Sequence, residues 1–276
     1  MSFTPEPYDP ITADSWLVCD TCGTQFPTSD RSTLKTCHIC DDPRQFVPPS
    51  GQSFSTLGEL KNKHKNEWTK CSSDENITFI SSVPKLAIGQ RAILIKTPEG
   101  NILWDCITLL DDETVERIKM YLSAEDKIWT TFSSPHQIFL TTLGTPILST
   151  AKAIKLGGHF PGSMVLHYNS RLFIADTLMT TASGVGNWSV DATGESRSRP
   201  AGLNSFSFLW SIPNFIPLGV GEMARMWGIL KGYEFGATHG GFMGMDIESE
   251  DVKGRVLESM KIQAGFIGDK AFEEKL

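Results

Sequence analysis

Short apolar runs alternate with turn residues through the middle of the chain. The runs that have the length of strands cover residues 79–83, 92–96, 101–105, 164–168 and 171–176. The second and third runs are separated by a Thr-Pro-Glu-Gly turn, and the last two by Asn-Ser. Because a short turn between two strand-like runs is typical of a β-hairpin, we predict two hairpins here.

Helical patterning occurs in four places. Apolar residues recur at helical spacing in residues 111–122, 219–230 and 251–263. Residues 55–68 begin with a hydroxyl residue that could cap a helix. Strands therefore come in consecutive hairpins, with helices between the groups. This order predicts an α+β fold in which two sheets pack in the middle and helices lie outside.

The composition is that of a globular protein. Hydrophobic residues make up 40% and charged residues 21% of the 276 residues, enough for a buried core. The net charge of -7 argues against general nucleic-acid binding, which needs a basic surface. No apolar run approaches the roughly 18 residues of a membrane span. The first residues carry prolines and acids and no apolar stretch, so we expect no secretory leader and an intracellular, cytoplasmic location.

Four of the six cysteines lie close together in the sequence. Cys19 and Cys22 form one C-x-x-C pair, and Cys37 and Cys40 form a second. Such a pair turns both thiolates toward one centre, and two pairs complete a tetrahedral site of the kind that holds Zn²⁺. The spacing alone leaves open a rubredoxin-like iron site, two disulfides and redox-active pairs. We predict a structural zinc ribbon, with His38 between the ligands as a bystander.

The other two cysteines, Cys71 and Cys106, stand alone. Cys106 follows the strand-like run 101–105, and we expect it to be buried. No partner base lies near it in the sequence, so thiol catalysis has no support.

The segment after the four cysteines predicts a linker and a helix. Residues 46–51 are rich in proline and small residues, which predicts the linker. Residues 55–68 form the predicted helix and contain most of a basic cluster. The lysines of this cluster are Lys61, Lys63, Lys65 and Lys70. A solvated helix face and an RNA- or phosphate-binding patch are both consistent with it. We divide the chain into a zinc ribbon at 1–50, a linker with a basic helix at 51–75, and a larger domain at 76–276.

Three isolated polar residues stand where strand-like runs end. His159 and His239 each lie in a turn rich in glycine, and Asp176 closes the run at 171–176. A histidine between glycines packs poorly but can point a nitrogen at an ion while the backbone comes close. Each residue alone is more often an ordinary loop histidine or turn aspartate. Together they predict a divalent metal site.

The same residues carry a resemblance to a known family. Residues 158–163 resemble the G-H-T-P-G-S motif of the metallo-β-lactamase superfamily, residues 173–177 its strand-ending aspartate motif, and residues 238–240 its last histidine motif. The order and the spacing match as well, over residues 76–245. With the four-cysteine ribbon in front, the chain resembles a fungal-type subgroup of that superfamily.

The resemblance implies a four-layer αβ/βα sandwich and hydrolysis by a metal-bound hydroxide. By the same resemblance, His159 and His239 would each bind one metal ion and Asp176 would bridge two. A bound divalent ion lowers the pKa of its water toward neutrality, which supplies a nucleophile at pH 7. Zinc or another divalent ion is the cofactor expected at this second site.

One family motif has no counterpart in this chain. The H-x-H motif, which supplies most ligands of the first metal, is missing, and the only histidine between residues 105 and 159 is His136. The predicted helix at 111–122 leads directly into residues 120–129, which resemble a family segment that follows the metal motif. A strand, the motif loop and a helix are therefore absent, and we predict an incomplete sandwich. His136 is a candidate replacement ligand.

A long stretch rich in glycine and serine follows the aspartate motif, at residues 183–204. The aromatic residues in it or just after it are Trp188, Phe206, Phe208 and Trp210. By the resemblance, this stretch would form a lip over the site, with the aromatic side chains against an apolar substrate. Core aromatics beside a loop are the alternative.

Three functions remain open from the sequence. The first is a zinc-dependent hydrolase that acts on an unknown small-molecule substrate. The second is an inactive relative, a pseudoenzyme, that acts by binding a metal or a protein. The third is a protein- or RNA-contact module built on the ribbon. The missing motif predicts that hydrolysis is impaired or absent, and the sequence predicts neither the substrate nor the oligomeric state.

Overall fold

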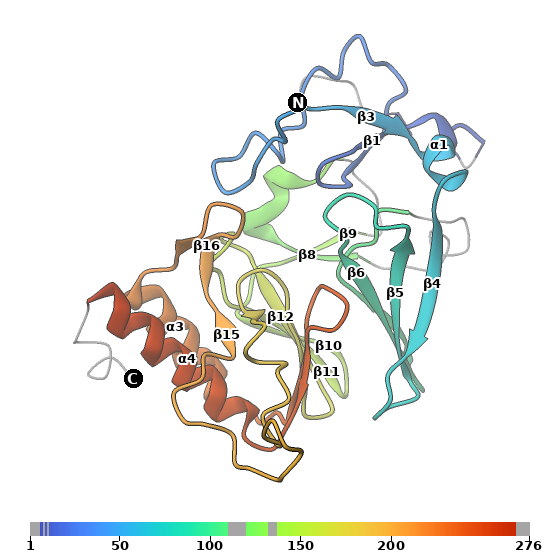
Figure 1. The fold of residues 1–276 in the computed structure, drawn as a ribbon. Coiled ribbons are helices and arrows are strands. Elements are labelled where there is room, and N and C mark those ends of the chain that lie inside the picture. The colour runs from blue at the N-terminus through green and yellow to red at the C-terminus, as the bar shows by residue number, and fades with distance from the viewer. Residues whose placement is uncertain (1–5, 8, 10, 110–119, 132–136, 269–276) are drawn as a thin grey trace. The chain divides into compact units, whose positions relative to one another are not determined.

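The chain folds into two compact units. The computed structural model describes residues 6–7, 9, 11–109, 120–131 and 137–268 (Figure 1). The first unit covers Met1–Thr141 and the second Thr142–Leu276. Helices and several sheets are present in the chain, so the predicted combination of helices and sheets is confirmed at this coarse level. The four-layer arrangement of the predicted α+β fold stays a prediction. Among the described residues, no helix combines the length and the apolar character that crossing a bilayer requires.

The N-terminal part of the first unit is a small three-stranded sheet with the order β2-β1-β3. Its elements are η1 (Ala13–Ser15), β1 (Leu17–Cys19), β2 (Gln25–Phe26), β3 (Phe54–Thr56) and α1 (Leu57–Lys61). A reciprocal capping box starts α1, because the Thr56 hydroxyl accepts from the Glu59 amide while the Glu59 carboxylate accepts from the Thr56 amide.

The next part of the first unit is a four-stranded antiparallel sheet with the order β4-β5-β6-β7. Its strands are β4 (Lys65–Lys70), β5 (Ile77–Val83), β6 (Arg91–Thr97) and β7 (Gly100–Trp104). The three predicted strands and the first predicted hairpin are thereby confirmed. Cys106, which we expected to be buried, is exposed just beyond β7, because the chain leaves the sheet there.

The predicted helix at 55–68 is wrong over most of its length. The capped helix stops at Lys61, and residues 65–70 instead pair along β5. Trp68 and Thr69 favour strands, and the pairing with β5 overrides the weak helical preference of the lysines. The basic cluster is consequently divided among α1, β4 and the turn between them. Within it, Lys61 pairs with Asp14 at 2.6 Å and Lys65 with Glu67 at 3.2 Å.

The last described part of the first unit is a parallel pair of strands with a short helix between them. These elements are β8 (Met120–Ser123), η2 (Ala124–Trp129) and β9 (Gln137–Leu140). The predicted helix at 111–122 falls mostly on residues 110–119, outside the described residues, and its last three residues belong to β8 instead. His136 also lies outside the described residues.

The second unit is built on a six-stranded sheet with the order β10-β11-β12-β13-β18-β19. Its strands are β10 (Gly144–Leu148), β11 (Ala151–Lys155), β12 (Met164–Tyr168), β13 (Arg171–Phe173), β18 (Ala237–His239) and β19 (Asp246–Glu248). Neighbouring strands are antiparallel except for β13 and β18, which run parallel. The predicted hairpin at 164–176 is confirmed as β12 and β13, with Asn169 and Ser170 both at positive φ in its turn.

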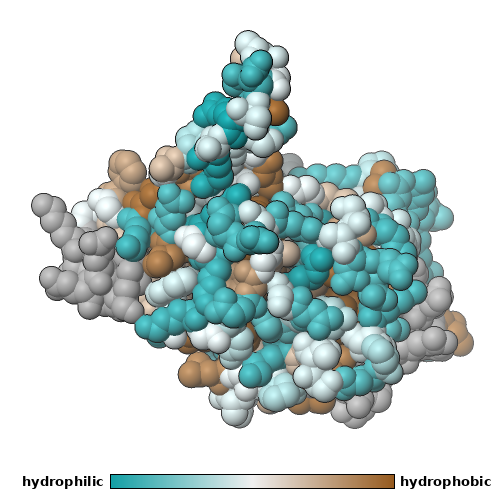
Figure 2. All heavy atoms as spheres, turned by 90° about the horizontal axis from the view of Figure 1, so that it is seen from below, coloured by the Kyte–Doolittle hydropathy of each residue, from teal (hydrophilic) through white to brown (hydrophobic). Residues whose placement is uncertain are grey.

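Helices α3 (Val220–Leu230) and α4 (Val252–Ile267) confirm the last two predicted helices. They pack against each other and supply apolar side chains to the main core of this unit. The fully or nearly fully buried members of this core include Ile154, Leu156, Leu172, Ile174, Met223, Met226, Leu230, Val256 and Met260. Each such side chain contributes about 1.5–3 kcal/mol by leaving water, so this core fixes the strand ends that carry the candidate residues. Hydrophilic side chains cover most of the face seen in Figure 2.

Two small strand pairs lie between β13 and α3 in the sequence. They are β14 (Met179–Thr180) with β15 (Phe206–Ser207), and β16 (Leu209–Ser211) with β17 (Ile216–Pro217). Phe206 and Phe208 are completely buried in the main core of the second unit. For these two aromatic residues the core interpretation is therefore correct, and the interpretation as part of a lip is wrong.

Candidate metal centres

The four cysteines come from two turns of the same kind. Cys19 ends β1, and its carbonyl accepts from the Gly23 amide at 2.9 Å. The Cys37 carbonyl likewise accepts from the Asp41 amide at 3.0 Å. Gly23 has a φ of +80°, and a Cβ there would lie 2.0 Å from the Thr108 hydroxyl oxygen, so only glycine fits this turn. The sequence thus folds each C-x-x-C pair into a turn that directs both sulfur atoms inward.

The sulfur atoms form a compact group. The Cys19 and Cys40 sulfur atoms lie 3.7 Å apart, as do those of Cys22 and Cys37, and all four lie within 4.8 Å of one another. A tetrahedral ion with metal–sulfur distances of about 2.3 Å requires sulfur atoms about 3.8 Å apart. A disulfide requires about 2.05 Å, and all four thiols are free. The group could therefore bind a metal ion.

Burial and mutual hydrogen bonding perturb these thiols. Cys19 and Cys37 are fully buried, whereas Cys22 is half-buried and contacts the Thr24 hydroxyl at 3.2 Å. Hydrogen bonds from the other three thiols, Cys22 first, lower the pKa of the Cys19 thiol. The hydrogen bond with Cys19 is the largest cause that raises the pKa of the Cys40 thiol. The close approach of the sulfur atoms therefore perturbs the thiols unequally, and a cation at the centre would stabilise negative charge on all four.

His38 lies beside this group and not in it. Its ring stacks on Trp129, with the centroids 6.4 Å apart, and meets Phe26 edge-on at 5.7 Å. Burial lowers the pKa of His38, which favours its neutral form. The metal-compatible group contains the four cysteines without His38, in agreement with the bystander interpretation.

His159 lies in a tight turn between β11 and β12. Its amide donates to the Thr177 hydroxyl at 3.1 Å, and the Thr177 hydroxyl donates to the Gly157 carbonyl. Gly158 has a φ of +91°, and a Cβ there would lie 2.2 Å from the Thr177 hydroxyl oxygen. The glycines before the histidine are therefore required by close approach of the backbone, and they hold a histidine side chain that is only 2% exposed.

Asp176 follows β13 and faces His159. The Nε2 atom of His159 and the Oδ2 atom of Asp176 are 3.8 Å apart. Although 42% of the Asp176 side chain is accessible, desolvation raises the pKa of its carboxyl above the usual range, and the charge of His159 partly opposes this. Of the predicted second site, the structure brings these two residues together.

His239 ends β18, and its ring is held by other partners. Its Nδ1 atom lies 3.0 Å from the Oδ1 atom of Asp246, and its Nε2 atom lies 3.1 Å from the Nη1 atom of Arg171. His239 is completely buried. Its ligand atoms do not lie within 4.8 Å of those of both His159 and Asp176, since these three described residues do not form such a group.

Sequence reasoning missed Arg171, Asp246 and Thr177. A signal existed for one of them: Asp246 lies directly opposite His239 in a strand pair joined by a glycine-rich turn. Arg171 offered no comparable signal, because its strand is 68 residues from His239 in the sequence. The Thr177 hydroxyl could be read only from the tertiary structure.

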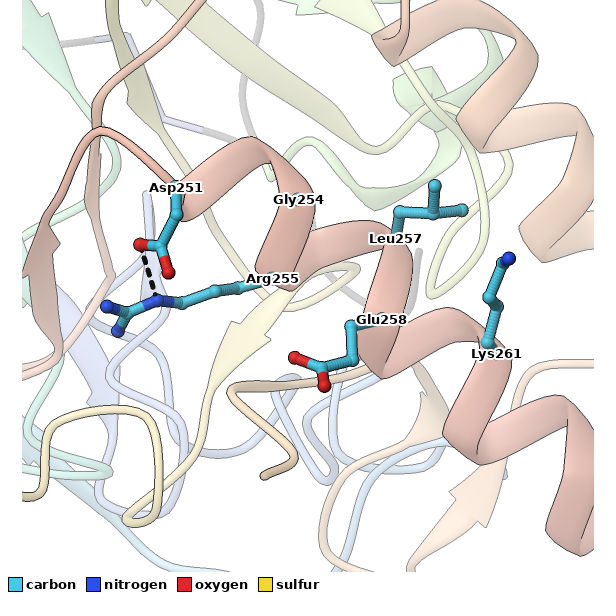
Figure 3. A pocket seen from close by; sticks show the side chains of 6 residues that line it. All are labelled: Asp251, Gly254, Arg255, Leu257, Glu258 and Lys261. Carbon is cyan, nitrogen blue, oxygen red and sulfur yellow. Dashed lines mark hydrogen bonds and ion pairs between the residues drawn. The ribbon is translucent and has the colours of Figure 1, made fainter. Parts of the chain in front are cut away.

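A separate hollow lies along α4 (Figure 3). Its lining residues are Asp251, Gly254, Arg255, Leu257, Glu258 and Lys261. All come from one helix, and the Arg255 side chain turns back to Asp251 rather than toward the other polar groups. None of the candidate metal ligands lines this hollow, so we assign it no role in metal binding.

Comparison with known proteins gives one relative at the sequence level. No family model matches the chain. The chain is 28% identical over 265 residues to the uncharacterized protein YmaE of Bacillus subtilis (strain 168), covering 86% of this chain and 92% of YmaE. Because 86% of 276 residues is fewer than 265, the alignment includes positions at which this chain has no residue.

Solved structures show only a weak likeness. A flavoprotein from Thermotoga maritima is 11% identical with a TM-score of 0.43, covering 71% of this chain and 60% of that chain. A mutant flavo di-iron protein from the same organism is 10% identical with a TM-score of 0.39 and a coverage of 71% and 61%. The chain thus spans about three fifths of these proteins. TM-scores below 0.5 do not establish a shared fold.

Proposed function

We propose that the chain is a zinc-binding relative of the metallo-β-lactamase superfamily in which the four cysteines hold a structural zinc ion. The sulfur–sulfur distances of 3.7 Å support this, because they equal the edge of a tetrahedral site to within about 0.1 Å. Four sulfur ligands close the coordination sphere, so no position remains for water or substrate. The centre therefore stabilises its surroundings and takes no part in chemistry.

We further propose that hydrolysis at the second site is impaired or absent. The carrying observation is that both ring nitrogens of His239 contact protein groups, Asp246 and Arg171, rather than the His159–Asp176 pair. Two side chains alone are fewer than the three protein ligands of a catalytic zinc site.

A hydrolysis assay tests this part of the proposal. Zinc-loaded full-length protein is incubated with a chromogenic β-lactam, a thioester, a phosphodiester and a lactone. We expect the same turnover from the wild-type chain and from His159→Ala, because His159 activates no water. His167→Ala serves as the control for a general effect of losing a histidine, since His167 contacts the Glu234 carbonyl and not the site. Metal-dependent turnover that disappears in His159→Ala but persists in His167→Ala contradicts the proposal.

Acid is expected to release the zinc ion. Without metal the raised pKa of the Cys40 thiol keeps its proton at neutral pH, so zinc binding must displace that proton. Because only the thiolate binds zinc, retention is complete at higher pH and is lost as the pH falls. For each proton that zinc displaces, the apparent affinity for zinc falls by about tenfold for every unit by which the pH is lowered. Competition with a chromogenic chelator from pH 8 to pH 5 measures this slope.

Two outcomes speak against the zinc centre. A pH-independent affinity means that thiolates are not the ligands. Iron in place of zinc, seen by elemental analysis of the purified chain, means that the site is of the rubredoxin type, since a tetrahedral four-sulfur site also suits iron.

A further inference from the structure

Four polar side chains share one face of the strands β13, β18 and β19. His239 lies directly opposite Asp246, and Glu248 lies opposite Ala237. Arg171 pairs with Ala237 from the other side, in parallel register. Because residues two apart in a strand point to the same side, Arg171, His239, Asp246 and Glu248 face the same way. At the alternate positions, Leu172 and Ile247 belong to the apolar core of the second unit.

The chemistry of arginine determines the tautomer of His239. A guanidinium group has only N–H donors and keeps its charge at all physiological pH values. The Nη1 atom of Arg171, 3.1 Å from Nε2 of His239, can therefore only donate, and Nε2 must be the unprotonated acceptor. The ring proton then resides on Nδ1, which donates to the Asp246 carboxylate at 3.0 Å. Every group in this arrangement has a complementary partner.

Arg171 is held in this position by a second carboxylate. Its Nη1 atom lies 3.3 Å from the Oε1 atom of Glu248, and only 15% of its side chain is accessible. Two carboxylates, Asp246 and Glu248, thus flank a buried histidine and a largely buried guanidinium. Such a network is stable only while each charge has its partner, because an unpaired buried charge is costly.

A metal ion does not fit at His239 while Arg171 is in place. A zinc–nitrogen bond is about 2.0–2.1 Å long and uses the same lone pair of Nε2 that accepts the hydrogen bond from Arg171. A divalent ion there would also lie beside a fixed positive charge, which repels it. The second metal centre that the family resemblance implies is therefore blocked at this ligand.

We propose that Arg171 is a positioning residue that supplies the positive charge at His239 in place of a metal ion and thereby keeps this histidine out of a metal centre with His159 and Asp176. This inference rests on the proposed impairment of the second site and names the side chain responsible. It predicts that removing the guanidinium makes Nε2 available to a metal.

The test compares metal binding by Arg171→Met and by the wild-type chain. Methionine keeps the length of the side chain and removes its charge and donors. After saturation of the four cysteines, zinc is added in excess, and the imidazole ¹⁵N resonances of His239, identified with His239→Asn, are recorded. We expect these resonances to shift with zinc in Arg171→Met and to stay unchanged in the wild type. If Arg171→Met folds and the ¹⁵N resonances of its His239 do not shift when zinc is added, the inference is overturned.

Arg255→Met is the matched control. Arg255 also pairs with a carboxylate, Asp251, at 2.8 Å, and its side chain is likewise 15% accessible, but it lies on α4 (Figure 3). Its loss should leave the response of His239 to zinc unchanged. A response in Arg255→Met equal to that in Arg171→Met would mean that a general loosening of the second unit, and not the guanidinium at His239, opens the site.

A measurement on the wild type keeps the inference testable if Arg171→Met does not fold. The same ¹⁵N spectrum reports the tautomer of His239, and we expect a proton on Nδ1 and none on Nε2. A proton or a metal on Nε2 overturns the inference. Hydrolysis by the wild type would contradict the proposed function, whereas an inactive wild type with the other tautomer contradicts only the role of Arg171.

Discussion

Replacing Cys19 with serine is expected to remove the metal ion from the four-cysteine group and to unfold the segment around it. The buried cluster around the site is small. It consists of three of the cysteines, Cys19, Cys37 and Cys40, and of three apolar residues, Leu17, Phe26 and Leu34. So small a core cannot hold the segment alone. Structural zinc supplies about 10–16 kcal/mol of binding free energy in zinc-finger peptides, which is comparable to or larger than the entire stability of a typical domain, about 5–15 kcal/mol.

Elemental analysis and hydrogen exchange check this expectation. Cys19→Ser should lose its stoichiometric zinc, and the amides of β1 should exchange as fast as those of an unfolded chain. Cys106→Ser is the matched control, because Cys106 is exposed and lies outside the sulfur group. The zinc content and the exchange of this variant should stay at the wild-type level. Full zinc retention and unchanged exchange in Cys19→Ser would show that the group is not a structural metal centre.

Local patterns predicted the features that depend on neighbouring residues. The two C-x-x-C pairs form a sulfur group because each pair folds within its own turn, and only the pairing of the two turns is tertiary. The hairpin β12–β13 follows from apolar runs on either side of Asn169-Ser170, and both turn residues take positive φ. In these places the sequence separation of the interacting groups is short.

Other features depend on residues outside the segment that carries the pattern. Residues 65–70 become strand β4 because β5 offers a complete set of partners, which the sequence of this segment does not reveal. The surroundings of His239 also depend on residues outside its own segment. The glycines next to it are consistent with a ligand, but whether Nε2 faces a metal or an arginine depends on Arg171, in another strand. A family resemblance predicts where the histidine lies, but it does not predict which group its Nε2 atom contacts.

Truncating Phe206 is expected to destabilise the second unit by about 3–5 kcal/mol, the usual cost of Phe→Ala in a core. Phe206 is completely buried in the main cluster of this unit. Its amide donates to the Ser259 hydroxyl of α4 at 3.1 Å, so β15 is tied to that helix at the same point. Alanine keeps this backbone hydrogen bond and leaves a cavity between the strand and the helix. A residue in a mobile lip would show almost no effect.

Phe266→Ala gives the comparison that separates burial from residue type. Phe266 belongs to the same unit and lies on α4, but it is 92% exposed. Because its side chain loses no packing, and alanine favours helices, its replacement should change the stability by less than about 0.5 kcal/mol. Hydrogen exchange of the buried α4 amides measures both variants in the intact chain. If the buried α4 amides exchange at the same rate in Phe206→Ala and Phe266→Ala, Phe206 does not support the core. That result would favour the interpretation of Phe206 as part of a lip.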